Sequence, residues 1–104
     1  MKDVKNLRRL KALSDLILNQ HLARLRACAE ARNQSLQRLS DLVVEPDDQL
    51  GPCASAAAAF QYERWAELRR SELNILLARQ TVAWMGARKD AEVAFGRSEV
   101  LRKL

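Results

Sequence analysis

Two long stretches of the chain carry apolar residues at alternating intervals of three and four, the pattern of helices that pack along one seam. In the first stretch, one charged residue, Arg32, interrupts the seam. The first seam comprises Leu18, Leu22, Leu25, Ala29, Arg32, Leu36, Leu39 and Val43, with Val4, Leu7, Leu10, Leu13 and Ile17 upstream. The second seam comprises Leu73, Leu77, Gln80, Trp84, Ala87, Ala91, Ala94, Ser98 and Leu101. Each seam predicts one helix with a single buried stripe.

A short segment marked by two prolines separates these stretches. Residues 3–44 contain neither Gly nor Pro, and the next eight residues read EPDDQLGP. Pro46 disfavours helical geometry at the residue before it, and Pro52 suits the start of a new helix. The sequence therefore predicts an all-α fold, an antiparallel two-helix coiled-coil hairpin that forms one domain over residues 1–104. We expect helices over about 3–44 and 54–104, with the turn at about 45–53.

The helical rise predicts which residues of the two helices lie opposite each other. If pairing starts directly at the turn, residue i of the first helix faces roughly residue 98 − i of the second. Leu25 would then meet Leu73, and the segment Phe95–Leu104 would extend past the first helix. An uncovered apolar end is either a partner-binding site or a frayed terminus. The apolar residues of this predicted overhang are Val100, Leu101 and Leu104.

The lower half of the second seam is rich in alanine, and two glycines lie near it. Small residues allow two helices to approach closely. A glycine inside a helix costs about 1 kcal/mol relative to alanine. We therefore expect packing or function to explain Gly86 and Gly96.

The net charge of +5 is distributed unevenly. The end of the hairpin that holds both termini is basic, whereas Asp41, Glu45, Asp47 and Asp48 make the turn acidic. Such polarity steers docking onto an acidic partner, although a solvated surface is the plainer interpretation. A pI near 9.8 also suggests nucleic acid as a partner. The sequence does not favour it, because no helix-turn-helix spacing, zinc ligands or aromatic platform accompany the charge.

Residues that could carry chemistry are few and isolated. His21 is the only histidine and lies at the edge of the first seam, where a two-helix rod offers no pocket for catalytic partners. Cys28 and Cys53 match no metal or redox motif, and about 24 Å of helix separates Cys28 from the turn, so we expect free thiols. We expect no enzymatic activity, cofactor, metal or small-molecule ligand. No apolar run approaches the ~20 residues that span a membrane, and no signal peptide is evident, which predicts a cytoplasmic protein.

The tail AFGRSEVLRKL (94–104), together with Leu7, Leu10, Leu13 and Ile17 among basic residues, resembles the FliJ/YscO-type stalk proteins of flagellar and virulence type III export machines. This resemblance implies a non-enzymatic stalk or adaptor in the central hole of the export ATPase hexamer. It also implies contacts with the export gate and with chaperones, in the cytoplasm and at most peripheral to the membrane export apparatus. The open end would enter the ring. The contact residues would be Lys5, Arg8, Arg9, Arg97, Val100, Leu101, Arg102 and Leu104.

A generic cytoplasmic coiled-coil adaptor, or a hairpin that pairs with a second copy into a four-helix bundle, is the alternative. A lone stalk needs one apolar stripe on each helix, whereas a bundle needs a second stripe. Leu42, Val44, Leu76 and Val82 lie off the two main seams. A homodimer therefore remains compatible with the sequence.

Overall fold

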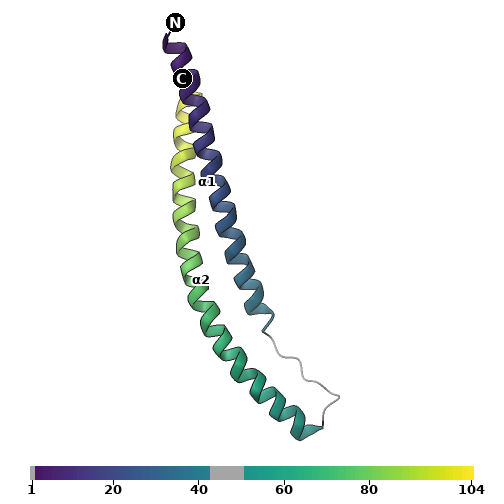
Figure 1. Ribbon diagram of the computed structural model, residues 1–104. Helices are drawn as coiled ribbons and strands as arrows, with labels where there is room; N and C mark the ends of the chain where they lie inside the picture. The colour runs from purple at the N-terminus through teal and green to yellow at the C-terminus, as the bar shows by residue number, and fades with distance from the viewer. Residues whose placement is uncertain (1, 43–50) are drawn as a thin grey trace.

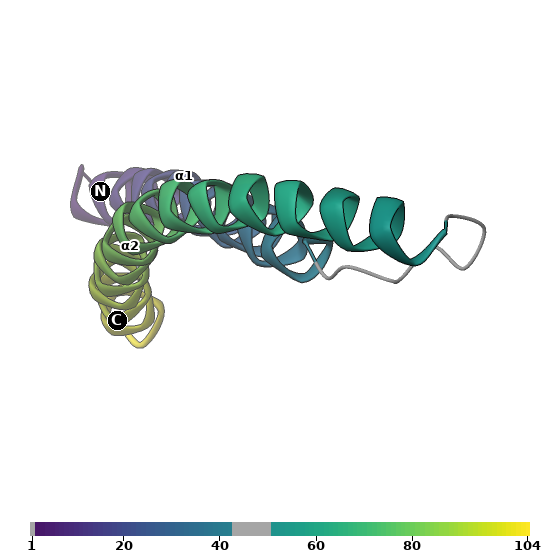
Figure 2. The same ribbon diagram turned by 90° about the horizontal axis from the view of Figure 1, so that it is seen from below.

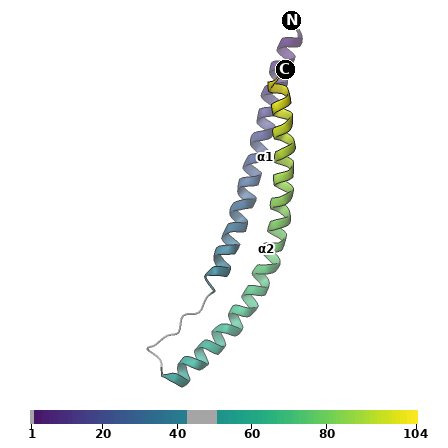
Figure 3. The same cartoon turned by 180° about the vertical axis from the view of Figure 1, so that it is seen from behind.

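The computed structural model describes residues 2–42 and 51–104, which form two antiparallel helices that lie side by side (Figures 1 and 3). Helix α1 spans Lys2–Ser40 and helix α2 spans Pro52–Arg102. The molecule is a rod about 84 Å long and 22 by 15 Å across. Helix accounts for 95% of the described structure. The prediction of an all-α two-helix hairpin is therefore confirmed.

The helix ends differ from the predicted ends by a few residues. Helix α2 starts at Pro52, with Gly51 as its extended N-cap residue, so proline occupies the first helical position as expected. Helix α1 ends at Ser40, earlier than the predicted end near residue 44, and Leu42 then packs against α2. Burial of Leu42 explains the early end, because Pro46 restricts only the residue before it. Pro46 itself and most of the predicted turn lie outside the described residues.

The predicted seam of α2 is confirmed at every position. Its buried members are one leucine, three alanines and one serine: Leu73, Ala87, Ala91, Ala94 and Ser98. Its half-buried members are Leu77, Gln80, Trp84 and Leu101. The buried side chains of this seam thus become smaller from the turn toward the C-terminus. Buried apolar surface is therefore concentrated near the turn.

The predicted seam of α1 is confirmed in part. Leu18, Leu25, Ala29, Arg32 and Leu39 are half-buried as expected, but Leu22 and Leu36 are exposed on the flank, at 38% and 39%. Val43, the last predicted member, lies outside the described residues. The inward face also includes His21, Cys28, Ser35 and Leu42, which are buried or half-buried. Two polar residues on this face hydrogen-bond across the interface. The Ser35 hydroxyl donates to Gln80 Oε1, and Arg32 Nε donates to Thr81 Oγ1 at 3.1 Å.

The pairing of the helices is also shifted along their axes from the predicted one. Three polar pairs define it: Ser98 with Asp15 (2.9 Å), Asp90 with Arg24 (3.9 Å), and Gln80 with Ser35. The residue numbers of these pairs add up to 113, 114 and 115, rather than to the predicted 98. Leu73 consequently packs in one cluster with Leu42 and Ala66, and the predicted contact with Leu25 is wrong.

This shift changes which segments project beyond the paired region. The first turns of α2 continue past the end of α1, so pairing does not begin at the turn as predicted (Figures 1 and 2). At the other end, the start of α1 projects beyond the C-terminus (Figure 3). The predicted overhang of Phe95–Leu104 is therefore wrong. That segment lies alongside α1, with Ser98 buried and Leu101 half-buried.

The two helical glycines do not mark a close approach. A Cβ added to Gly86 or Gly96 would have no packing neighbour within 4 Å among the described residues. Both positions are exposed on α2. Packing against α1 therefore does not explain the two glycines, since neither faces α1, and a functional explanation stays a prediction.

Candidate protein-binding surface

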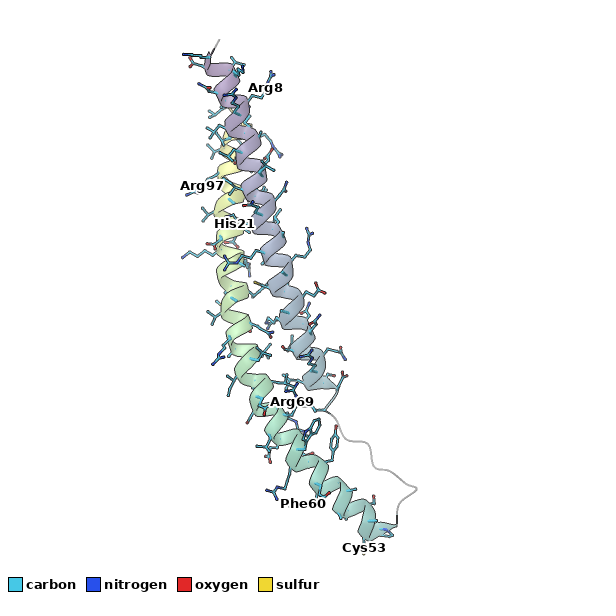
Figure 4. All side chains as sticks on the ribbon, in the orientation of Figure 1. Arg8, His21, Cys53, Phe60, Arg69 and Arg97 are labelled. Carbon is cyan, nitrogen blue, oxygen red and sulfur yellow. The ribbon has the colours of Figure 1, made fainter. Side chains whose placement is uncertain are left out.

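The open end of the hairpin is rich in exposed positive charge. Lys5, Arg8 and Arg9 are exposed on the first turns of α1, and Arg97 and Arg102 are exposed on the last turns of α2. Figure 4 shows Arg8 and Arg97 projecting from different helices at this end. The predicted basic character of the open end is therefore present at its surface. A surface of this kind attracts acidic partners and increases their association rate.

A shallow apolar groove runs between the helices at the same end. The α1 side chains of Leu10, Leu13 and Ile17 line it together with Ala94 and Leu101 of α2. The three α1 residues are about half exposed. A rotation of α1 about its own axis by one residue position could have buried each of them. The helix does not adopt that phase, because the polar contacts of Ser35, Arg32 and Asp15 fix the inward face.

A second shallow depression continues the groove toward the middle of the rod. His21, Asp90 and Val93 line it, and Ala94 and Arg97 belong to both hollows. Asp90 also forms the ion pair with Arg24 that crosses between the helices. One side of the hairpin therefore presents a continuous strip that is apolar around Leu10, Leu13 and Ile17 and polar around His21 and Asp90, with Arg97 lining both hollows. His21 is half-buried at an inward position, close to the seam-edge location that the sequence predicted.

The opposite side of the open end is polar. Lys11, Asp15, Ser98 and Arg102 line a small hollow there. Arg102 also pairs with Glu99 at 3.4 Å. Asp15 accepts the Ser98 hydrogen bond, which ties the two helices together on this side. The two sides of the open end thus differ in chemistry, since one carries a groove lined mainly by apolar residues and the other a hollow lined by charged and polar residues.

The structure places the eight predicted contact residues on more than one side of the hairpin. Arg97 and Leu101 lie in the apolar groove. Arg102 lies on the polar side, and Arg8 belongs to that side too, because it precedes Asp15 by one heptad. Lys5, Arg9, Val100 and Leu104 are exposed but line neither hollow. The eight predicted residues therefore share one end of the rod but do not form a single contiguous surface.

The groove residues of α1 were not predicted from the sequence to be part of the protein-binding surface. Leu10, Leu13 and Ile17 were placed on the buried seam, and the α2 overhang was expected to carry the apolar contact instead. The available signal was the break in spacing between Ile17 and Leu18. Such a break means that the two groups of leucines cannot lie on one stripe.

Aromatic side chains form a second exposed apolar region near the start of α2. Phe60, Trp65 and Leu68 are exposed there, and the rings of Tyr62 and Trp65 pack at 5.5 Å. Figure 4 shows Phe60 and Cys53 on the part of α2 that continues past α1. Further along α2, Trp84 lies between the guanidinium groups of Arg32 and Arg88, at 5.6 and 5.8 Å from its ring. Trp84 is thus a seam residue held by two cation–π contacts.

Within residues 2–42 and 51–104, no group of three or more His, Cys, Asp or Glu side chains is placed to hold a metal ion. Both cysteines are free, with Cys28 half-buried and Cys53 exposed, as the sequence predicted. Neither described helix has an apolar stretch long enough to cross a membrane.

Comparisons of the chain with protein-family models, with curated proteins and with solved structures find no match. The class that the fold defines is an extended helical hairpin with an apolar groove at its basic end.

Proposed function

We propose that this protein is a coiled-coil adaptor that binds a segment of a partner protein at its open end. The observation that carries the proposal is the groove of Leu10, Leu13, Ile17 and Leu101, which leaves apolar side chains about half exposed beside Arg97. A groove of this kind fits the apolar face of an amphipathic helix, and the surrounding positive charge favours acidic residues on its polar face. The adaptor would have no enzymatic activity of its own.

The more specific proposal is that the partner belongs to a flagellar-type protein export apparatus. It rests on the resemblance of the two termini to the FliJ/YscO-type stalk proteins. On this proposal the open end docks on the cytoplasmic export ATPase, and the hairpin assists delivery of substrates or chaperones to the export gate. The rod shape and the basic open end support it, because a stalk must be narrow and must carry its contacts at one end.

The binding test compares two exposed leucines of α1, one that lines the groove and one that does not. Leu13 lines the groove and is 54% exposed, whereas Leu16 is 62% exposed and lines no groove with α2. We expect Leu13→Asp to weaken binding to a purified export ATPase by at least about tenfold, as expected when an apolar anchor is lost. Leu16→Asp is the matched control and should bind like the unchanged chain. Fluorescence anisotropy measures both, and circular dichroism checks that both fold.

Two results would separate the general from the specific proposal. If the unchanged chain does not bind the ATPase, the export proposal fails, and the adaptor proposal is then tested by capture of partners from the native cell with the same two variants. Equal capture by Leu13→Asp and by the unchanged chain would contradict the groove as the binding site.

A further inference from the structure

The side of α2 that faces away from α1 carries a second stripe with helical spacing. Its eight positions follow one another at intervals of three and four, and all are exposed: Ile75, Ala78, Val82, Gly86, Lys89, Val93, Gly96 and Val100. All of them except Ala78 lie two residues after a seam position, which places these seven about 200° around the helix from α1. The stripe is apolar or small at every position except Lys89. A soluble helix normally has charged residues on its outer face, so this pattern indicates a second packing surface.

Six of the eight stripe positions pair with one another when the direction of the stripe is reversed, and the two small residues Ala78 and Gly96 lie opposite Arg97 and Arg79. In an antiparallel pair of α2 helices whose facing residue numbers add up to 175, Ile75 lies opposite Val100, and Val82 lies opposite Val93. The only cation of the stripe, Lys89, lies opposite Gly86, whose missing side chain leaves room for the lysine stem.

Charge also matches at the ends of this arrangement. The same pairing places Glu72 opposite Lys103, and both are exposed. Glu72 already accepts a hydrogen bond from Arg69 of its own helix at 3.1 Å, and a carboxylate can accept from a second cation. A two-fold interface requires this kind of self-complementarity, because each surface patch meets an identical patch.

We propose that the outer face of α2 binds a second copy of this chain, with the two α2 helices antiparallel and each α1 on the outside. The stripe from Ile75 to Val100 rises about 38 Å along the helix. One helix pair of this length buries less surface than most stable interfaces, so we expect a reversible dimer that forms at micromolar concentrations. This interface includes Val93 of the second hollow and brings Arg97 opposite Ala78, but it uses none of the leucines of the groove and does not depend on the proposed function.

The register of the dimer is tested by cysteine cross-linking in a chain with Cys28→Ser and Cys53→Ser. Chains carrying Val82→Cys and chains carrying Val93→Cys are oxidised separately and as a mixture. A disulfide requires Cα atoms within about 7 Å. In the proposed pairing residue 82 of one copy meets residue 93 of the other, whereas two copies of residue 82 are about 16 Å apart along the axis. We expect a covalent dimer in the mixture and little in either chain alone.

The affinity of the dimer is tested by sedimentation equilibrium on charge variants. Val82 and Phe60 are similarly exposed on α2, at 71% and 66%, but Val82 belongs to the stripe, whereas Phe60 lies 12 residues before Glu72, the first residue of the proposed pairing. Val82→Glu should weaken dimerisation by at least about tenfold, and Phe60→Glu should leave it unchanged. The double variant Val82→Glu/Val93→Lys should recover much of the loss, because the new charges then face each other.

Several outcomes would overturn the proposal. A chain that stays monomeric at all accessible concentrations has no such interface. Cross-linking of Val82→Cys chains alone, as strong as in the mixture, contradicts the antiparallel register. Equal weakening by Val82→Glu and Phe60→Glu shows that the contact lies elsewhere.

Discussion

The half of the hairpin near the turn and the half at the open end are held together differently. Near the turn, Leu73 packs with Leu42 and Ala66, and Ser35 hydrogen-bonds to Gln80 across the interface. At the open end, α2 contributes small residues to the seam: Ala87, Ala91, Ala94 and Ser98. The leucines that could have filled a larger core there lie exposed on the flank of α1. The half near the turn thus buries the leucine cluster, although Phe60, Trp65 and Leu68 stay exposed there, while the open end buries mainly small side chains.

This difference separates stability from binding along one rod. A fully buried leucine stabilises a fold by about 1.5–3 kcal/mol relative to an exposed one, and a buried alanine contributes much less. The half near the turn therefore provides most of the stability that the chain has. The open end keeps Leu10, Leu13 and Ile17 available for a partner, which is the arrangement that an adaptor needs.

The largest expected effect on stability is in the core near the turn. Leu73→Ala should reduce the free energy of unfolding by about 2–3 kcal/mol, because it leaves a cavity beside Leu42 and Ala66. Leu13→Ala at the open end is the matched control and should change stability by less than about 0.5 kcal/mol. Urea denaturation followed by circular dichroism measures both. Equal losses for the two variants would contradict the division into a stabilising half and a binding half.

A smaller loss is expected from the polar contact between the helices. Ser35→Ala removes the hydroxyl that binds Gln80, and an unpaired polar group in a buried site costs about 1–3 kcal/mol. Because Gln80 is only half-buried and water can reach it in part, we expect the lower end of that range. The double variant Ser35→Ala/Gln80→Leu should recover part of the loss in the same denaturation assay. No recovery would mean that the serine acts through packing alone.

Substitution of the exposed glycines of α2 by alanine should increase the free energy of unfolding, unlike the changes above. Gly86→Ala and Gly96→Ala should each increase stability by about 0.5–1 kcal/mol, because alanine favours helix and the new Cβ meets no neighbour in the hairpin. The measurement belongs at low protein concentration, where monomers dominate. Destabilisation of the monomer by either change would show that its glycine packs against another part of the chain.

The smallest effect is expected from the ion pair between the helices. Arg24 and Asp90 lie 3.9 Å apart with both side chains more than half exposed. Such pairs contribute about 0–1 kcal/mol and are screened by salt. Arg24→Ala should therefore change the unfolding midpoint only slightly, and the change should vanish in 1 M salt. A loss that persists at high salt would indicate packing by the arginine stem.

The fold and the α2 seam could be predicted from the sequence because their signals are local. The proline-marked break and the regular spacing from Leu73 to Leu101 depend only on helical geometry. The full α1 seam and the pairing could not be predicted, because they depend on contacts between residues distant in sequence. Leu22 and Leu36 suit a seam by hydrophobicity, but the structure instead buries Ser35, which hydrogen-bonds to Gln80 of α2.

The candidate site lies at the end of the rod that the sequence predicted, although the predicted pairing of the helices was wrong. Charge could be assigned to the open end from sequence, since Lys5, Arg8 and Arg97 lie near the termini in any hairpin. The apolar contact could not be assigned from the sequence, because the location of the uncovered leucines depends on where the helices pair. With the observed pairing, the accessible apolar residues include Leu10 and Leu13 of α1 as well as the tail of α2.

The pairing of the helices is the central claim, because the groove exists only if the end of α2 lies against the start of α1. It is tested by two double-cysteine chains, each with Cys28→Ser and Cys53→Ser. In the first, Asp15→Cys and Ser98→Cys replace side chains that are in contact at 2.9 Å. In the second, Asp15→Cys is combined with Ala83→Cys. Residue 83 would lie opposite residue 15 if the helices paired directly from the turn, and it lies about 22 Å from residue 98 along α2.

Under mild oxidation at high dilution, mass spectrometry of proteolytic fragments reports which disulfide forms within one molecule. We expect an intramolecular bridge between positions 15 and 98, and none between positions 15 and 83. A bridge between 15 and 83 with none between 15 and 98 would contradict the pairing, and with it the groove at the open end.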